Sequence, residues 1–406
     1  MGTNRRFHST CGSKIEETNS YLDKSVSAGA ITEQERQIID EYIEELCATT
    51  QISPTRRYKI AGTIVRTHAY FPEFSACTLS DVYKAIETIK TATKEDGKPR
   101  FTKNTISDYV RMVKRLFIWL CENGYSQIDI KKLEKIKVPH YDRSSVTSEG
   151  LLTEEEVEAI IRACTNSRDR ALISMLYEGG FRIGEIGNLT WGDLNFTDTN
   201  VTARTSEKTG KTRFVPLFMS REYICQWRDN YPLPITPEAF VFLTTTTKKP
   251  LQYKGILKQI RLLATRAGIT KHVKPHLFRH SRITHLCRQG LSESAIKMMM
   301  WGDVSTNMLR TYLHLTSDDV AAQVAELNGV ELPEKNEKKR ERGLKPIQCP
   351  RCACMNSPTS KYCSTCGFAL TLESKENVSN MEDAIREAMA NNPFIMQEII
   401  AAMQKR

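Results

Sequence analysis

The chain has 406 residues, of which 40% are hydrophobic and 26% are charged. This length exceeds one ordinary domain, so we expect two or three. Lys and Arg number 58 against 48 Asp and Glu, and the net charge of +10 favours a polyanionic partner without identifying one. No apolar run reaches the ~18 residues of a membrane span, and MGTNRRFHST lacks the apolar core of a secretory signal. We therefore expect a cytoplasmic protein with no membrane partner.

The amino-terminal third is predicted to be helical after a disordered start. Residues 1–25 are rich in Ser, Thr and Asn, a composition typical of disorder. Helical patterns run from 26 to 138, most clearly in NTISDYVRMVKRLFIWLCENGY, which Asn123-Gly124 would terminate. Its apolar stripe is Ile106, Tyr109, Val110, Val113, Leu116, Phe117 and Leu120. Arg111, Lys114 and Arg115 lie off that stripe, on a face that suits either phosphate contacts or solvent alone.

The middle of the chain is predicted to form a second domain. Residues 139–150 have no periodicity and predict a linker. LLTEEEVEAIIRAC then begins a helix with a capping box of Thr153 and Glu156. The segment 151–330 is mostly helical, but VTART and TRFVPL predict a hairpin whose turn spans Lys208 to Lys211. The expected fold class is mainly α with a small β-sheet (α+β).

The carboxyl end contains a cysteine cluster between a charged linker, 331–346, and a tail of two amphipathic helical patterns, 374–406. Within 347–370, two CxxC pairs lie ten residues apart: Cys349 with Cys352, and Cys363 with Cys366. Four thiolates at this spacing suit tetrahedral Zn²⁺ with no open catalytic position, so we predict a structural zinc ribbon. Cys354 is an alternative ligand, and the seven other cysteines are expected to be reduced.

Four short motifs carry residues suited to chemistry on a phosphodiester. They are FRIGEIGNLTWGDL around Arg182, SEKTGKTRFVPL around Lys208, PHLFRH with His276 and Arg279, and MLRTYLHL with Tyr312. Guanidiniums cannot lose their proton and stabilise the charge that spreads over phosphate oxygens. A histidine titrates near neutrality, and a tyrosine can form a covalent phosphoester.

The local context predicts where three of these side chains lie. Gly179-Gly180 would end one helix and place Arg182 at the start of the next, with Glu185 one turn further on to hold its guanidinium. Pro275 is a favourable first helical residue, so His276 and Arg279 should project from one face of an opening turn. 

In this order the motifs resemble the catalytic domain of the tyrosine recombinases, or phage-type integrases. The resemblance covers about residues 30 to 330, and 26–138 is similar to the helical core-binding domain of that family. WGDVSTNMLRTYLHL and the zinc ribbon look more like archaeal integrases. The resemblance implies a site-specific recombinase that cleaves DNA through a 3′-phosphotyrosine at Tyr312. It also implies that Lys208 protonates the departing 5′ oxygen and that neither ATP nor a catalytic metal is needed.

One position departs from the family pattern. Between His276 and Tyr312 these enzymes usually carry a second histidine or a tryptophan that donates a hydrogen bond to the phosphate. Here Asp303 stands in register, and an ionised carboxylate only accepts hydrogen bonds. Either Trp301 supplies the donor or the donor is missing.

The resemblance also implies the partners. They are double-stranded DNA at a specific recombination site, with Lys211 as a further DNA contact, and copies of this chain: a monomer or dimer when free and a homo-tetramer on DNA. The tail would dock on a neighbouring protomer, or fold back on its own chain. Two other functions stay open: a DNA-relaxing enzyme similar to type IB topoisomerases, and a non-catalytic DNA-binding protein on a degenerate recombinase fold.

Overall fold

The computed structural model describes residues 11–141, 150–206, 212–311 and 344–391. The chain divides into two compact units, residues 1–146 and 147–406, and the boundary falls within the predicted linker 139–150. Each unit is described by itself. No helix among the described residues is long and apolar enough to cross a membrane.

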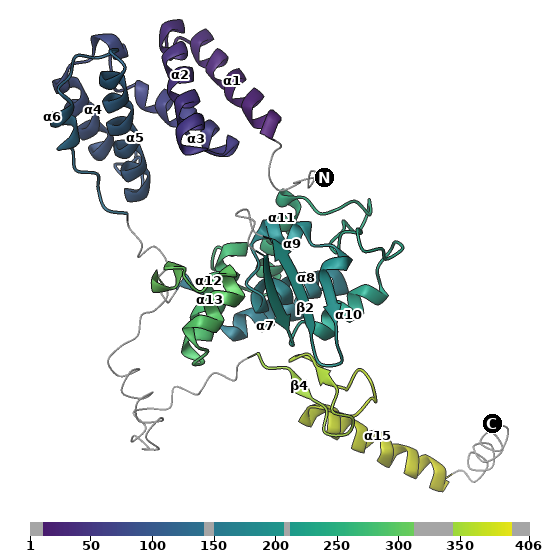
Figure 1. Cartoon of the computed structure of the whole chain (residues 1–406). Coiled ribbons are helices and arrows are strands. Elements are labelled where there is room, and N and C mark those ends of the chain that lie inside the picture. Colours follow the sequence, from purple (N-terminus) through teal and green to yellow (C-terminus); the bar gives the residue numbers. More distant parts are fainter. Residues whose placement is uncertain (1–10, 142–149, 207–211, 312–343, 392–406) are drawn as a thin grey trace. The chain divides into compact units, whose positions relative to one another are not determined.

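The described residues of the first unit, 11–141, form helices joined by loops (Figure 1). Its helices are α1 (Cys11–Ser27), α2 (Glu33–Thr50), α3 (Pro54–His68), the 3-10 turn η1 (Phe74–Ala76), α4 (Leu79–Thr91), α5 (Lys103–Glu122) and α6 (Ile130–Glu134). Side chains of Thr32, Ser53, Thr78 and Thr102 cap four of them by accepting a backbone N–H of the first turn. The predicted stripe of α5 lies in the core, with Ile106 partly buried and the other six residues buried.

The prediction of disorder over residues 1–25 is wrong for residues 11–25, which belong to α1. This helix is polar overall, but Thr18, Leu22 and Ser25 recur at three- and four-residue spacing and are buried. The hydroxyls of Thr18 and Ser25 donate to carbonyls one turn back, so the helix buries them without leaving a polar group unpaired. Composition missed this face because serine and threonine count as polar wherever they lie. Residues 1–10 lie outside the described residues.

The second unit surrounds a small sheet with helices. Its elements are α7 (Glu154–Arg162), α8 (Ser167–Glu178), α9 (Ile183–Asn188), η3 (Trp191–Asp193), β1 (Leu194–Phe196), β2 (Val201–Ser206), β3 (Thr212–Leu217), α10 (Arg221–Asp229), α11 (Tyr253–Arg266), α12 (Pro275–Arg288), α13 (Glu293–Trp301) and η4 (Met308–Thr311). The capping box of Thr153 and Glu156 is present at α7. The mainly α fold class with a small sheet is confirmed.

The sheet is antiparallel in the order β1-β2-β3. The predicted hairpin is β2 with β3, in a register that pairs Val201 with Leu217 and Ser206 with Thr212. Its turn, with Lys208 and Lys211, lies outside the described residues. The short strand β1 was not predicted, because three residues of LNF are too few to establish an alternation.

The cysteine-rich segment lies on the second unit. It contains the two-stranded pair β4 (Ile347–Gln348) and β5 (Met355–Asn356), followed by α15 (Leu372–Asn391). The buried carboxylate of Glu222 on α10 accepts from the backbone N–H of Ser357 and, at 2.6 Å, from the hydroxyl of Ser360. The hydroxyls of Tyr223 and Thr359 are 2.5 Å apart. These contacts fix the segment to α10, a pairing that the predicted order of charged linker, cysteine cluster and helical tail did not indicate.

Candidate active site and metal centre

Arg182 lies where the glycine pair predicted, as the N-cap residue of α9. α8 ends at Glu178, and Gly180 adopts a positive φ of 54° that turns the chain. The Arg182 guanidinium is 34% exposed and donates to Glu185 at 3.1 Å. The second oxygen of Glu185 accepts the Arg182 backbone N–H at 2.7 Å. Glu185 therefore holds both the main chain and the side chain of Arg182 while the guanidinium stays accessible.

Glu185 is ionised although it is buried. Burial alone would raise the pKa of its carboxyl, but the charge and hydrogen bonds of Arg213, then the Arg182 backbone and Arg279, lower the pKa below its ordinary value. A carboxylate that is ionised at neutral pH thus lies among three arginines, Arg182, Arg213 and Arg279.

His276 and Arg279 project from the first turn of α12, which begins at Pro275. Arg279 is 3% exposed, and its two terminal nitrogens each donate at 2.7 Å, one to the carbonyl of Gly180 and one to that of Met300. His276 is exposed, but partial desolvation of its imidazole by surrounding protein atoms lowers the pKa. The positive charges of Arg279 and Arg182 lower the pKa further. The structure therefore brings Arg182, His276 and Arg279 together, with His276 uncharged at neutral pH.

His280 lies next to His276, with ring centroids 5.6 Å apart. Burial, then His276 and Arg279, lower the pKa of His280 to about 4. A neutral, partly buried imidazole beside the site suits a structural role.

Trp301 is the last residue of α13, and Asp303 lies just beyond the helix. The Asp303 carboxylate accepts from the backbone N–H of Ser305 at 2.9 Å and from its hydroxyl at 2.7 Å, so it stabilises its own turn. Trp301 is 7% exposed, and its ring centroid is 5.2 Å from Cζ of Arg279. This cation–π contact helps to hold the Arg279 guanidinium.

Lys208, Lys211 and Tyr312 fall outside the described residues. Ser206 and Thr212 are the last residues described on either side of the two lysines. η4 ends at Thr311, immediately before Tyr312, and its residue Leu309 is fully buried among Ile283, Leu286 and Trp301. The chain therefore approaches the predicted nucleophile from an anchored turn.

The sequence interpretation missed Arg213. Its side chain is fully buried on β3 and bonds to both oxygens of Glu185. In TRFVPL the buried positions alternate, and Arg213 shares its side of the strand with Val215 and Leu217. A cation at an inward position of an alternating strand was the available signal.

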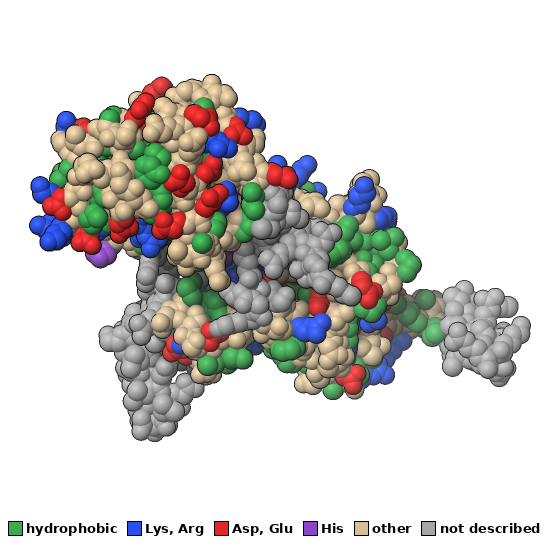
Figure 2. All heavy atoms as spheres, turned by 45° about the horizontal axis from the view of Figure 1, so that its top comes forward, with side chains coloured by type: hydrophobic (Ala, Val, Ile, Leu, Met, Phe, Trp, Pro, Cys, Tyr) green, Lys and Arg blue, Asp and Glu red, His purple; other side chains and the backbone are tan. Residues whose placement is uncertain are grey.

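In the first unit, the three predicted DNA-contact residues differ in their surroundings. Arg111 is exposed and lies 3.6 Å from Asp108 and 6.0 Å from the Tyr141 ring. The Lys114 ammonium donates to the carbonyls of Glu134 and Ile136, so it ties the end of α6 to α5. Arg115 is exposed. On the face drawn in Figure 2, basic and acidic side chains of this unit are interspersed.

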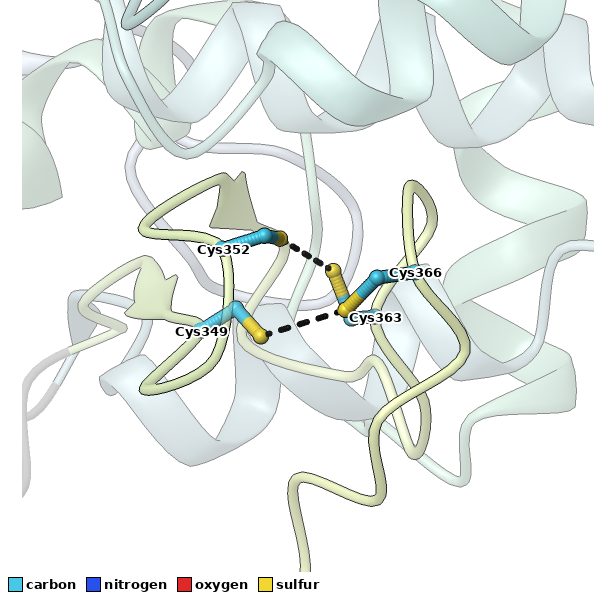
Figure 3. A group of neighbouring side chains, drawn as sticks. All are labelled: Cys349, Cys352, Cys363 and Cys366. Carbon is cyan, nitrogen blue, oxygen red and sulfur yellow. Dashed lines mark hydrogen bonds between the residues drawn. The ribbon is translucent and has the colours of Figure 1, made fainter.

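The four predicted metal ligands converge (Figure 3). The sulfur atoms of Cys349, Cys352, Cys363 and Cys366 all lie within 4.8 Å of one another. Cys349 and Cys366 are 3.7 Å apart, and Cys352 and Cys363 are 3.5 Å apart. Tetrahedral Zn²⁺ with bonds of about 2.3 Å places its sulfurs about 3.8 Å apart, so the cluster fits zinc.

The backbone of the two cysteine pairs supports this geometry. In each pair the residue after the second cysteine donates its backbone N–H to the carbonyl oxygen of the first cysteine at 2.9 Å, from Ala353 to Cys349 and from Gly367 to Cys363. Ala353 and Gly367 both have positive φ, 57° and 70°. Cys354 does not belong to the cluster; its sulfur accepts from the hydroxyl of Thr365. 

Comparison with known proteins identifies the family. Residues 151–318 match the model of the phage integrase family. The chain is 30% identical over 239 residues to a tyrosine recombinase of Thermosipho africanus, a match that covers 57% of this chain and 80% of that protein. The chain belongs to the tyrosine recombinase family. This recombinase is also 24% identical over 290 residues to tyrosine recombinase XerA of Pyrococcus horikoshii, covering 70% and 93% of the two chains.

Solved structures show the same fold. The recombinase matches the lambda integrase bound to DNA with a TM-score of 0.52 and 14% identity, over 69% of this chain and 96% of that one. It matches the integrase of transposon Tn1549 in complex with circular intermediate DNA with a TM-score of 0.53 and 17% identity, over 71% and 99%. The resemblance drawn from the motifs is therefore confirmed at the level of family and fold, whereas the archaeal affinity stays a prediction.

Proposed function

We propose that this site-specific DNA recombinase cuts one DNA strand with the hydroxyl of Tyr312. The Tyr312 oxygen bonds to the phosphorus, the bond to the 5′ oxygen breaks, and a 3′-phosphotyrosine conserves the energy of the broken ester without ATP or a catalytic metal. The observation that carries this proposal is the convergence of Arg182, His276 and Arg279 from α9 and α12. 

The three described residues suit distinct roles at the phosphate. Arg182 and Arg279 would stabilise the charge on the non-bridging oxygens in the transition state. The lowered pKa of His276 leaves its imidazole neutral, so it can accept the proton of the Tyr312 hydroxyl. Lys208 would donate a proton to the departing 5′ oxygen. Asp303 holds the turn after α13. Of Asp303 and Trp301, only Trp301 can supply the second hydrogen-bond donor that is usual in the family.

The macromolecular partner would be double-stranded DNA carrying a specific recombination site. Arg111, Arg115 and Lys211 are proposed to contact its phosphates, and Lys114 to do so less directly because two carbonyls hold its ammonium. Strand exchange between two duplexes needs four cuts, so we propose a homo-tetramer on DNA.

We propose that the cysteine cluster holds a structural Zn²⁺ through Cys349, Cys352, Cys363 and Cys366. Zinc content of the purified protein tests this directly. Cys352→Ser should lower zinc below one equivalent, and Cys354→Ser, whose sulfur lies outside the cluster, should leave one equivalent. Equal loss in both variants would contradict the ligand set.

A nicked suicide duplex containing the recombination site, incubated in EDTA, tests the proposed chemistry. The native protein should form a covalent DNA adduct, and Tyr312→Phe should form none. An adduct that persists in Tyr312→Phe, or cleavage that requires Mg²⁺, contradicts the assignment. Absence of any adduct with the native protein favours a non-catalytic DNA-binding protein. Relaxation of supercoiled plasmids without joining of two sites favours a topoisomerase.

A further inference from the structure

Arg213 is the largest fully buried side chain among the described residues. Burying a guanidinium is costly unless its charge is paired and its donors are satisfied. Arg213 meets both conditions, and its partners all belong to segments that carry the candidate active site.

One side of the Arg213 guanidinium pairs with Glu185. Nε donates to one carboxylate oxygen at 3.3 Å and one terminal nitrogen donates to the other at 2.5 Å. The same carboxylate accepts from the backbone and side chain of Arg182. Because one carboxylate serves both arginines, the position of Arg213 determines where Glu185 can hold Arg182.

The other side of the guanidinium joins two backbone segments. Its remaining terminal nitrogen donates to the carbonyl of Gly179 at 3.3 Å and to that of Met299 at 2.5 Å. Arg279 bonds to the next carbonyl of each segment, those of Gly180 and Met300. Two guanidiniums thus connect the turn before Arg182 to the end of α13.

The close approach of β3 to the end of α13 supports this arrangement. Gly302 has φ +66°, and a Cβ at this position would lie 3.0 Å from the carbonyl oxygen of Thr212 and 3.2 Å from Cβ of Arg213. The Phe181 ring, with its centroid 5.1 Å from Cζ of Arg213, packs against the guanidinium. The Arg213 guanidinium is therefore enclosed, with no exposed surface of its own.

We propose that Arg213 is a positioning residue for DNA cleavage. It fixes Glu185, so that the half-exposed Arg182 guanidinium is held in one orientation before DNA binds, and it ties the Arg182 turn to the segment that leads to Tyr312. An unrestrained arginine would have to lose rotamer entropy on meeting the phosphate. The inference rests on the proposed function, because orientation of Arg182 matters only if Arg182 contacts the reacting phosphate.

Arg213→Lys is the informative substitution. Lysine keeps the positive charge beside Glu185, but its ammonium is a compact group with three donors and cannot reproduce a planar fork that bonds to a carboxylate and two carbonyls. Arg204→Lys on β2 is the matched control. Arg204 is exposed and lies 3.5 Å from Asp193, outside the proposed machinery.

The test measures the rate of adduct formation on the nicked duplex and, separately, the Kd for that duplex. Arg213→Lys should cut the cleavage rate by ~100-fold, the effect expected of a small misplacement of a catalytic group, with Kd changed less than about twofold. Arg204→Lys should cleave at the native rate. Glu185→Gln should reproduce the defect, which keeps the proposal testable if Arg213→Lys folds poorly.

A double-mutant cycle distinguishes positioning from a general structural role. If Arg213 acts through Arg182, the variant with both Arg182→Lys and Arg213→Lys should cleave no more than about threefold more slowly than Arg182→Lys alone. The proposal is overturned if the rate losses of the two substitutions multiply in the double variant. It is also overturned if Arg213→Lys cleaves at the native rate, or if it loses binding and cleavage equally. A native protein that forms no Tyr312-dependent adduct would overturn the proposed function and this inference with it. If the native protein forms the Tyr312-dependent adduct and only the predictions for the Arg213 variants fail, the proposed function stands.

Discussion

Two arginines of the same candidate site have opposite surroundings. Arg182 is 34% exposed and has an ionised carboxylate beside it, whereas Arg279 is 3% exposed and bonds to buried carbonyls. The partly exposed guanidinium of Arg182 can therefore reach a ligand. Arg279 must also maintain the fold, because removing it leaves buried carbonyls without their donor.

We predict that Arg182→Ala and Arg279→Ala both lose cleavage by about two to three orders of magnitude, because the stabilisation arises in the transition state. DNA affinity should change much less. Only Arg279→Ala should also lower the free energy of unfolding, by about 1–3 kcal/mol for each carbonyl left unpaired. Adduct assays, binding titrations and urea unfolding separate these effects. Equal losses of affinity and cleavage would identify ordinary phosphate contacts.

The lowered pKa of His285 predicts how the free energy of unfolding depends on pH. Burial, then Arg282 and Arg288, lower the pKa of its imidazole from 6.5 to about 4, and Nδ1 lies 2.8 Å from the Tyr177 hydroxyl. Above pH 6.5 the residue is neutral in both states. As pH falls from 6.5 towards 4, only the unfolded chain takes up the proton, so the native state loses up to about 3 kcal/mol.

Urea unfolding at pH 7 and pH 4.5 measures this loss. His285→Gln cannot take up the proton and should lose less stability between the two pH values, although His280 contributes in the same direction. His272→Gln, at an exposed position, should lose as much as the native protein. The prediction fails if His285→Gln loses as much stability between the two pH values as the native protein does.

At the scale of elements, α10 connects the cysteine-rich segment 347–370, which we propose to be a zinc ribbon, to the rest of the second unit. Glu222 is 8% exposed, and its carboxylate accepts from Ser357 and Ser360 of the ribbon and, at 3.0 Å, from Gln226. A second contact joins the backbone N–H of Leu344 to the buried carboxylate of Glu154 on α7. The ribbon is therefore attached at its middle, and the chain just before it is attached at Leu344.

We predict that Glu222→Ala loosens the ribbon without emptying its metal site, because the ligands lie on the ribbon itself. Hydrogen exchange should speed up in residues 344–371, while zinc content stays at one equivalent. Glu238→Ala, at an exposed position, is the control. Unchanged exchange in Glu222→Ala would show that the α10 contact does not hold the ribbon.

At the scale of the whole molecule, the described tail presents an uncovered apolar face. On α15, Met381 is 67% exposed and Ile385 is 44% exposed. The alternative in which this helix folds back on its own chain is not seen among the described residues, while Pro393 and the second amphipathic pattern lie outside them. The start of α15 is bound to the ribbon, because the Ser374 hydroxyl donates to the carbonyl of Lys361.

We predict that removal of residues 377–406 leaves single-site cleavage intact and weakens assembly of a complex of four protomers on two duplexes. The deletion keeps Ser374 and so spares the ribbon. Sedimentation and gel-shift assays measure assembly, and Met381→Glu with Ile385→Glu should reproduce the loss. Normal assembly and recombination by the truncated protein would show that the tail does not link protomers.

Much of this protein follows from its sequence, because several features depend on residues within a few positions of each other. The capping box at Thr153, the stripe of α5, the turn before Arg182 and the two cysteine pairs are of this kind. Their spacing alone determines which groups share a helix face or a metal. The family followed from the order of such motifs.

Tertiary structure decided the features that join distant parts of the chain. Arg213 meets Met299, and Glu222 meets Ser357, and neither pairing leaves a local pattern. α1 is helical because the core accepts its serine and threonine face, which composition cannot reveal. Burial turns a charged side chain from a solvated group into one that must be paired, and burial is a property of the folded chain, not of its local sequence.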